Sequence, residues 1–144
     1  IIMKLIMIFC LFFGFSFSTF AKENNFFDKA KKLYEEEKFE ESKFLFQRNI
    51  VYNPKHARSY LYLAKIYKIE EDNSEEEKNI NTTLLLEPRN EEAMYLLIEI
   101  EIDRSNFSKA NELKNNFKKI CSSFCDKLSS IDIRLKEFEK KDAS

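Results

Sequence analysis

The stretch from Ala57 to Asn90, ARSYLYLAKIYKIEEDNSEEEKNINTTLLLEPRN, decides the fold of this chain. In its first half, apolar side chains such as Tyr60, Leu63 and Tyr67 recur at the three- and four-residue spacing of an amphipathic helix. An acidic segment follows, and the second half ends in an apolar run that Pro88 closes. The stretch therefore predicts a helix, a turn and a second helix.

The same pattern recurs along the chain at a period of 34 residues. Pro54 returns as Pro88, and at another phase of the repeat Phe39 and Phe107 hold the same place two periods apart. A period in this range indicates stacked units, because one such unit cannot bury its apolar face alone. We predict three copies, at about 23–56, 57–90 and 91–125.

This spacing resembles the tetratricopeptide repeat (TPR) family. The middle copy matches the family pattern at seven positions, which are Tyr60, Leu63, Ala64, Tyr67, Ile80, Leu84 and Pro88. The chain departs from the pattern at Glu76, where the family has a small residue between its two helices, at Asn73, which replaces an aromatic residue, and at Ser122, which replaces the third proline. The resemblance implies an all-α fold, an α-solenoid of about three helix-turn-helix repeats.

Residues 126–144 are predicted to form a capping helix and a polar tail. Leu128, Ile131, Leu135 and Phe138 recur at spacings of three and four, which is typical of a helix with one apolar stripe. Such a helix would seal the open end of the last repeat.

Residues 1–21 have the layout of a secretory signal peptide. Lys4 supplies a positive charge, an almost wholly apolar run follows, and small residues precede the expected cleavage after Ala21. An uncleaved anchor is the alternative, because the apolar run lies at the lower limit for spanning a bilayer. The excess of lysine over arginine, with abundant Asn, Ile and Phe, favours a bacterial source. We therefore expect export to the periplasm, or anchoring in the inner membrane through this leader alone.

Cys121 and Cys125 are the two cysteines that follow the leader. In an oxidising compartment such a pair is expected to form a disulfide, and the repeat register places Ser122-Ser123 at a turn that would allow it. A redox-active thiol pair is the alternative.

The composition argues against an enzyme. The one glycine, Gly14, lies in the leader, so the rest of the chain lacks the phosphate-cradling loops that glycine permits. His56 is the only histidine, and the acidic runs 35–37, 70–72 and 75–77 lack the spacing of a calcium loop, so we expect solvated side chains. The 24 Lys+Arg and 25 Asp+Glu give a net charge of −1, which does not point to nucleic acid. We predict no catalytic residues, metal or cofactor.

The TPR resemblance implies that a protein or peptide binds along the concave face, which the first helix of each repeat forms. Aromatic residues there would supply anchors, and the cations would meet carboxylates of the partner. Ordinary solvated surface is the competing interpretation. The matching positions are Phe27, Lys31, Tyr34, Arg58, Leu61, Lys65, Lys68, Tyr95, Glu99 and Ile102.

Three functions follow from these predictions. The first is an exported scaffold or adaptor that binds a protein, and the second is a thiol-handling factor that uses Cys121 and Cys125. The third is a membrane-anchored assembly factor, which shares the adaptor mechanism and differs in keeping its leader.

Overall fold

The computed structural model describes residues 25–142, with side chains as far as Glu137, and this part of the chain is all helical. The predicted leader lies outside the described residues. No helix among residues 25–142 is long and apolar enough to cross a membrane. The seven helices are α2 (Phe26–Glu35), α3 (Phe39–Tyr52), α4 (Ala57–Ile69), α5 (Asn73–Leu86), α6 (Glu91–Asp103), α7 (Phe107–Ile120) and α8 (Lys127–Asp142).

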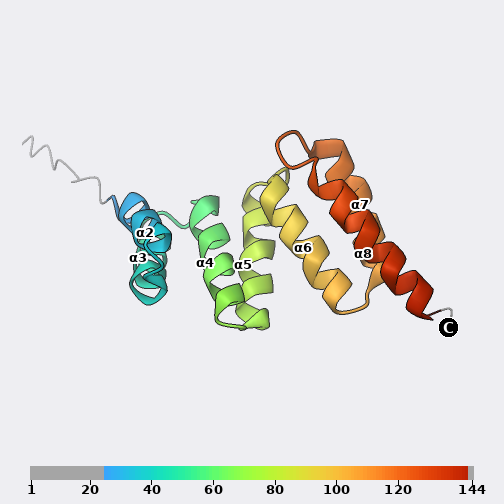
Figure 1. Ribbon diagram of the computed structural model, residues 1–144. Coiled ribbons are helices and arrows are strands. Elements are labelled where there is room, and N and C mark those ends of the chain that lie inside the picture. Colours follow the sequence, from blue (N-terminus) through green and yellow to red (C-terminus); the bar gives the residue numbers. More distant parts are fainter. Residues whose placement is uncertain (1–24, 143–144) are drawn as a thin grey trace, which may run out of the picture.

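The helices pack in sequential pairs, α2 with α3, α4 with α5 and α6 with α7, and the pairs follow one another in a row (Figure 1). The second helices begin at Phe39, Asn73 and Phe107, which are 34 residues apart. The helix α8 packs against α6 and α7 at the end of the row. The predicted α-solenoid with a capping helix is confirmed.

The turn inside each pair has the same backbone geometry in all three copies. Glu37, Glu71 and Ser105 take φ values of 59°, 60° and 60°, and they too are 34 residues apart. In the first copy, the N–H of Lys38 donates to the carbonyl of Leu33 at 2.9 Å, which is the closing hydrogen bond of a Schellman motif. The turn thus ends each first helix with a left-handed residue, although none of the three is glycine.

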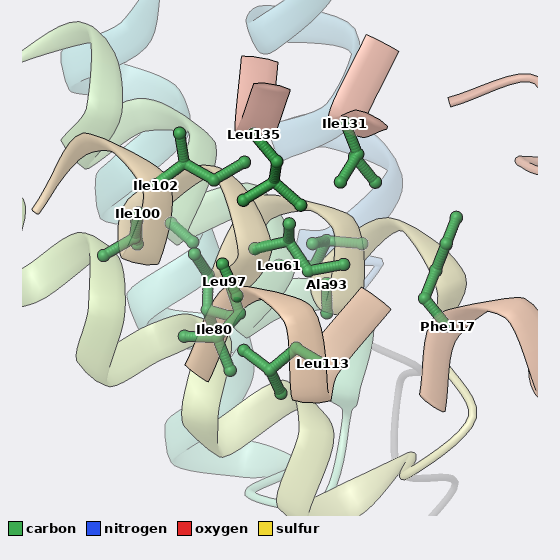
Figure 2. Close-up of a cluster of buried hydrophobic side chains, with 13 residues drawn as sticks. Leu61, Ile80, Ala93, Leu97, Ile100, Ile102, Leu113, Phe117, Ile131 and Leu135 are labelled. Carbon is green, nitrogen blue, oxygen red and sulfur yellow. The ribbon is translucent and has the colours of Figure 1, made fainter. Parts of the chain in front are cut away.

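The larger of two buried clusters joins α4, α5, α6, α7 and α8 (Figure 2). From α8 it takes Ile131 and Leu135, which are 0% and 4% exposed. Leu128 packs against the same cluster, whereas the side chain of Phe138 lies outside the described part of the chain. The predicted apolar stripe of the capping helix therefore closes the last repeat.

The smaller cluster holds the first repeat to the second. Its buried members are Ala30, Phe46, Leu63 and Ile66, from α2, α3 and α4. Half-buried tyrosine and phenylalanine rings pack around it, among them Tyr34 and Tyr62. The first two repeats therefore meet through a largely aromatic contact.

Ser42, Glu76 and Ala110 occupy equivalent positions between the two helices of their pairs and are 0%, 4% and 0% exposed. The prediction that the acidic run 75–77 is solvated is therefore wrong for Glu76. The repeat register forces this side chain into the helix contact, whatever its polarity. Its Oε1 atom accepts no hydrogen bond from the described residues and lies 4.0 Å from Nζ of Lys68. Burial raises the pKa of the Glu76 carboxyl, and the charge of Lys68 opposes the rise.

Candidate functional site

The first-helix face is the surface that the predicted binding residues of α2, α4 and α6 form. Most of its side chains reach solvent at least in part, but Leu61 and Ile102 are only 5% and 0% exposed. Both belong to the larger buried cluster. The prediction that both side chains lie open on a partner-binding surface is therefore wrong: Ile102 is a core residue, and Leu61 is a core residue that reaches the surface only in the wall of the pocket described below. Sequence spacing alone could not separate them, because both follow the same helical period as their exposed neighbours.

Aromatic rings line the first-helix face where α2 meets α4. The ring of Tyr62 lies 5.9 Å from that of Phe27, 5.1 Å from that of Tyr34 and 5.0 Å from that of Phe46, between centroids. The Nζ atom of Lys65 lies 4.8 Å from the centroid of the Tyr62 ring. Burial raises the pKa of the Tyr34 hydroxyl, and Lys65 partly opposes the rise. Sequence reasoning missed Tyr62, although its aromatic character and its spacing of three from Lys65 were visible.

The lysines on this face are engaged by glutamates of the same chain. Lys65 of α4 forms an ion pair with Glu92 of α6, and Lys31 lies 3.4 Å from Glu35 one turn along α2. Lys68 has the buried Glu76 as its neighbour. Glu92 was not among the predicted site residues, although it is the second residue of α6, as the predicted Arg58 is the second residue of α4.

At the far end of the face, α8 supplies a cation to two acidic side chains of α6, the predicted Glu99 and its neighbour Asp103. Arg134 of α8 donates to Glu99 and, at 2.6 Å, to Asp103, both of α6. Tyr95 remains half-buried, with Nζ of Lys127 5.9 Å from its ring centroid. The capping helix therefore covers the charges of the third repeat, and free charge on this face is concentrated nearer the second repeat.

Arg58 differs from these lysines because no carboxylate of residues 25–137 forms an ion pair with it. Its guanidinium carbon lies 4.9 Å from the centroid of the Phe27 ring. The ring of His56 also packs against Phe27, with ring centroids 4.5 Å apart. The imidazole Nδ1 is 2.9 Å from Oγ of Ser59, and burial together with the charge of Arg58 lowers the pKa of His56. His56 is half-buried here, not freely solvated as predicted.

A pocket of about 640 Å³ opens where α4 and α6 begin, at one end of the first-helix face. The turn after α5 forms one part of its wall, and the loop after α7 forms another. The lining residues are Arg58, Leu61, Glu87, Pro88, Arg89, Asn90, Glu91, Glu92, Ser123 and Phe124. Only Arg58 and Leu61 belong to the predicted site residues. Most of the other members come from the turn after α5 and the loop after α7, which the helical period does not describe, and Glu91 and Glu92 lie in the first turn of α6.

Two kinds of interaction, a disulfide and a set of hydrogen bonds, fix the loop after α7. A disulfide joins Cys121 to Cys125, with their Cα atoms 5.2 Å apart. The carboxylate of Glu91 accepts hydrogen bonds from Oγ of Ser122 at 2.6 Å and from the backbone N–H groups of Ser123 and Phe124 at 2.9 and 2.8 Å. The hydroxyl, and then the backbone donors, lower the pKa of Glu91 to about 2. The loop is thereby held against the start of α6.

Within residues 25–142, no three His, Cys, Asp or Glu side chains are grouped so that they could hold a metal ion. The arrangement offers aromatic rings, guanidinium groups and an open pocket, which are the components of a binding surface.

Comparisons with solved structures show the fold. The Yersinia enterocolitica type III secretion translocator chaperone SycD matches 83% of this chain and 85% of its own, with a TM-score of 0.71 and 12% sequence identity. The same chaperone in complex with a peptide of the translocator YopD matches 82% of this chain and 92% of its own, also with a TM-score of 0.71 and 12% identity.

The Sgt2 TPR domain from Aspergillus fumigatus matches 81% of this chain and 80% of its own, with a TM-score of 0.66 and 11% identity. No protein-family model matches the sequence, and neither does any curated protein. At these identities the likeness concerns the backbone arrangement. The chain therefore has the tetratricopeptide-repeat fold, as its 34-residue period predicts.

Proposed function

We propose that this protein is a non-enzymatic TPR scaffold that binds a protein or peptide segment along its first-helix face. One observation carries the proposal. Arg58 rests on the half-buried Phe27 ring, which in turn packs against the rings of His56 and Tyr62, and no carboxylate of residues 25–137 forms an ion pair with Arg58. Aromatic and arginine side chains are the residues that most often carry binding energy in interfaces, so this group is suited to a partner.

The comparison structures support the same proposal by analogy. SycD has been seen with a peptide of the translocator YopD, and its backbone is similar to that of this chain. A shared fold does not fix a function, so the argument still depends on the side chains of this chain. Those side chains offer rings and a cation along the face where an extended segment would lie.

We further propose that the protein works outside the cytoplasm, in the periplasm of a bacterium. The signal-like composition of residues 1–21 and a disulfide of the kind that oxidising compartments maintain support this location. Mass spectrometry of the mature protein tests it directly. An N-terminus at Lys22 would support export with cleavage, whereas a retained leader would favour the anchored alternative.

Charge reversal on the first-helix face tests the binding proposal. Partners crosslinked to the wild type in native extract are compared with those of a Lys31→Glu/Arg58→Glu variant. A Lys118→Glu/Lys119→Glu variant is the matched control, because these two exposed lysines lie on α7, a second helix. We expect a partner that the control retains and the first-helix variant loses, with both variants folded by circular dichroism. Equal capture by both variants would move binding away from this face.

A further inference from the structure

The pocket at the start of α4 and α6 combines apolar walls with two arginines. Leu61, Pro88 and Phe124 contribute apolar surface, and Arg58 and Arg89 contribute charge. Pockets that are largely apolar and carry a few convergent polar groups are the usual form of a ligand-binding site. The volume of about 640 Å³ is ample for one large apolar side chain and its neighbours.

The acidic residues around the pocket are already engaged. Glu91 accepts three hydrogen bonds from the disulfide loop, and Glu92 pairs with Lys65. Glu87 accepts a hydrogen bond from the side chain of Asn90 at 2.9 Å. These partners hold the glutamates in place, and the ion pair with Lys65 neutralises the charge of Glu92 within the chain.

The two arginines are in the opposite situation. Among residues 25–137, no carboxylate lies within ion-pair distance of Arg58, and the same is true of Arg89. Arg58 is exposed and rests on the Phe27 ring, and Arg89 is exposed in the turn before α6. A guanidinium donates two parallel hydrogen bonds to a carboxylate, so each arginine can bind one carboxylate of a partner.

We propose that this pocket takes a large apolar side chain of an extended partner segment, and that carboxylates next to that side chain in the segment pair with Arg58 and Arg89. The inference rests on the proposed function, because it names the chemistry of the segment that the first-helix face binds. The occupant is thus an acidic peptide with an apolar anchor. The net charge of −1 provides no basic field for nucleic acid, and the apolar wall of Leu61, Pro88 and Phe124 suits a peptide side chain.

The disulfide loop belongs to the same site. Ser123 and Phe124 line the pocket and lie between the bridged Cys121 and Cys125. Glu91 binds the backbone of both residues. Reduction of the bridge removes one restraint on this wall and leaves the hydrogen bonds to Glu91 and the packing of Phe124 against the larger cluster. We therefore expect peptide affinity to depend on the redox state of the pair.

Fluorescence anisotropy with defined peptides tests the inference on the full chain. Three fluorescein-labelled twelve-residue peptide pools carry a central Leu or Phe, flanked by Asp and Glu in the first pool, by Asn and Gln in the second and by Lys in the third. We expect the acidic pool to bind about tenfold more tightly than the neutral pool, which is the discrimination that one charged hydrogen-bonded pair provides. The basic pool is expected to bind least.

Two variants locate the site. Arg58→Glu/Arg89→Glu should abolish the preference for the acidic pool, since it removes both guanidinium groups. Arg48→Glu is the matched control, because Arg48 is also exposed, also rests on an aromatic ring at 4.8 Å and lies on α3. Prior reduction with dithiothreitol should lower the affinity of the wild type for the acidic pool and leave its far-ultraviolet circular dichroism unchanged.

The other outcomes separate the two proposals. Tight peptide binding that shows no acidic preference, or that survives the double arginine substitution, would overturn the pocket assignment and leave the first-helix face as the binding surface. Failure of all three pools to bind would contradict both proposals. Arginine-dependent binding of a twelve-nucleotide single-stranded DNA in place of the peptides would overturn the assignment in favour of nucleic acid.

Discussion

Replacement of Glu76 by alanine should stabilise the protein at neutral pH. Glu76 fills the position that Ser42 and Ala110 occupy in the other repeats, and it buries a carboxylate there. A buried polar group without a hydrogen-bond partner costs about 1–3 kcal/mol, and ordering a glutamate side chain costs about 1.5 kcal/mol more. The substitution removes both costs.

Two losses oppose this gain. Removal of the buried γ-methylene group costs about 0.8 kcal/mol, and the small cavity that it leaves costs about as much again. Loss of the ion pair with Lys68, which is 49% exposed, costs less than about 1 kcal/mol. The balance favours the variant by about 1 kcal/mol, which corresponds to a rise of about 4 °C in the melting temperature of a domain of this size.

The gain should depend on pH, and its sign follows from the raised pKa of Glu76. Folding takes up a proton between the ordinary carboxyl pKa of 4.5 and the raised value, so wild-type stability increases as the pH falls through that window. The alanine variant lacks this term. Its advantage should therefore be largest at pH 7 and should shrink toward pH 4.5.

Urea unfolding at several pH values measures this difference. Glu41→Ala is the control, since it removes the same charge from an exposed position in the first turn of α3. We expect this control to lose a few tenths of a kcal/mol at most, through the helix dipole. A Glu76→Ala variant less stable than the wild type at pH 7, or a gain that does not change with pH, would refute the reasoning.

Three further changes probe the turns and the disulfide loop. Glu71→Gly should stabilise the protein by about 1 kcal/mol in thermal unfolding, because φ is 60° at this position. Glu70→Gly, where φ is −79°, should destabilise the protein by about 0.5–1 kcal/mol. Equal effects of the two substitutions would contradict the Schellman assignment. Glu91→Gln should flatten the loss of stability in acid titrations between pH 4.5 and about 2, the window in which wild-type Glu91 takes up its proton, and an unchanged profile would exclude Glu91 as the loop anchor. Cys121→Ala/Cys125→Ala should cost at most about 2 kcal/mol in urea unfolding, because the closed loop is short, and a larger loss would mean that the bridge supports more than this loop.

The helical repeat could be predicted from the sequence because packing makes it periodic. The apolar side chains that α4 buries, Leu63 and Ala64 among them, appear in the sequence at helical spacing, and prolines mark the ends of the repeats. The left-handed turn positions keep the same period, although no glycine marks them. Period and spacing together were enough to predict the solenoid.

The binding surface was harder to predict, because exposure depends on neighbouring helices. Leu61 and Ile102 follow the same spacing as residues that remain accessible, and only the packing of adjacent repeats buries them. Glu76 was predicted to be solvated with its acidic run, although the repeat pattern places it between the two helices, and that position buries it. The pocket was not predictable from helix periods, since Phe124 reaches it through a loop that Glu91 holds from 33 residues away.

Site-specific photo-crosslinking in living cells tests the central claim, that a partner binds along the first-helix face. A photoreactive phenylalanine analogue replaces Tyr34 or Tyr95 on that face. As controls it replaces Val51 or Leu85 on the second helices, whose side chains are 78% and 80% exposed. We predict a covalent adduct with the same partner from positions 34 and 95 and none from positions 51 and 85. Adducts confined to positions 51 and 85 would contradict the account and would place the binding surface on the second helices.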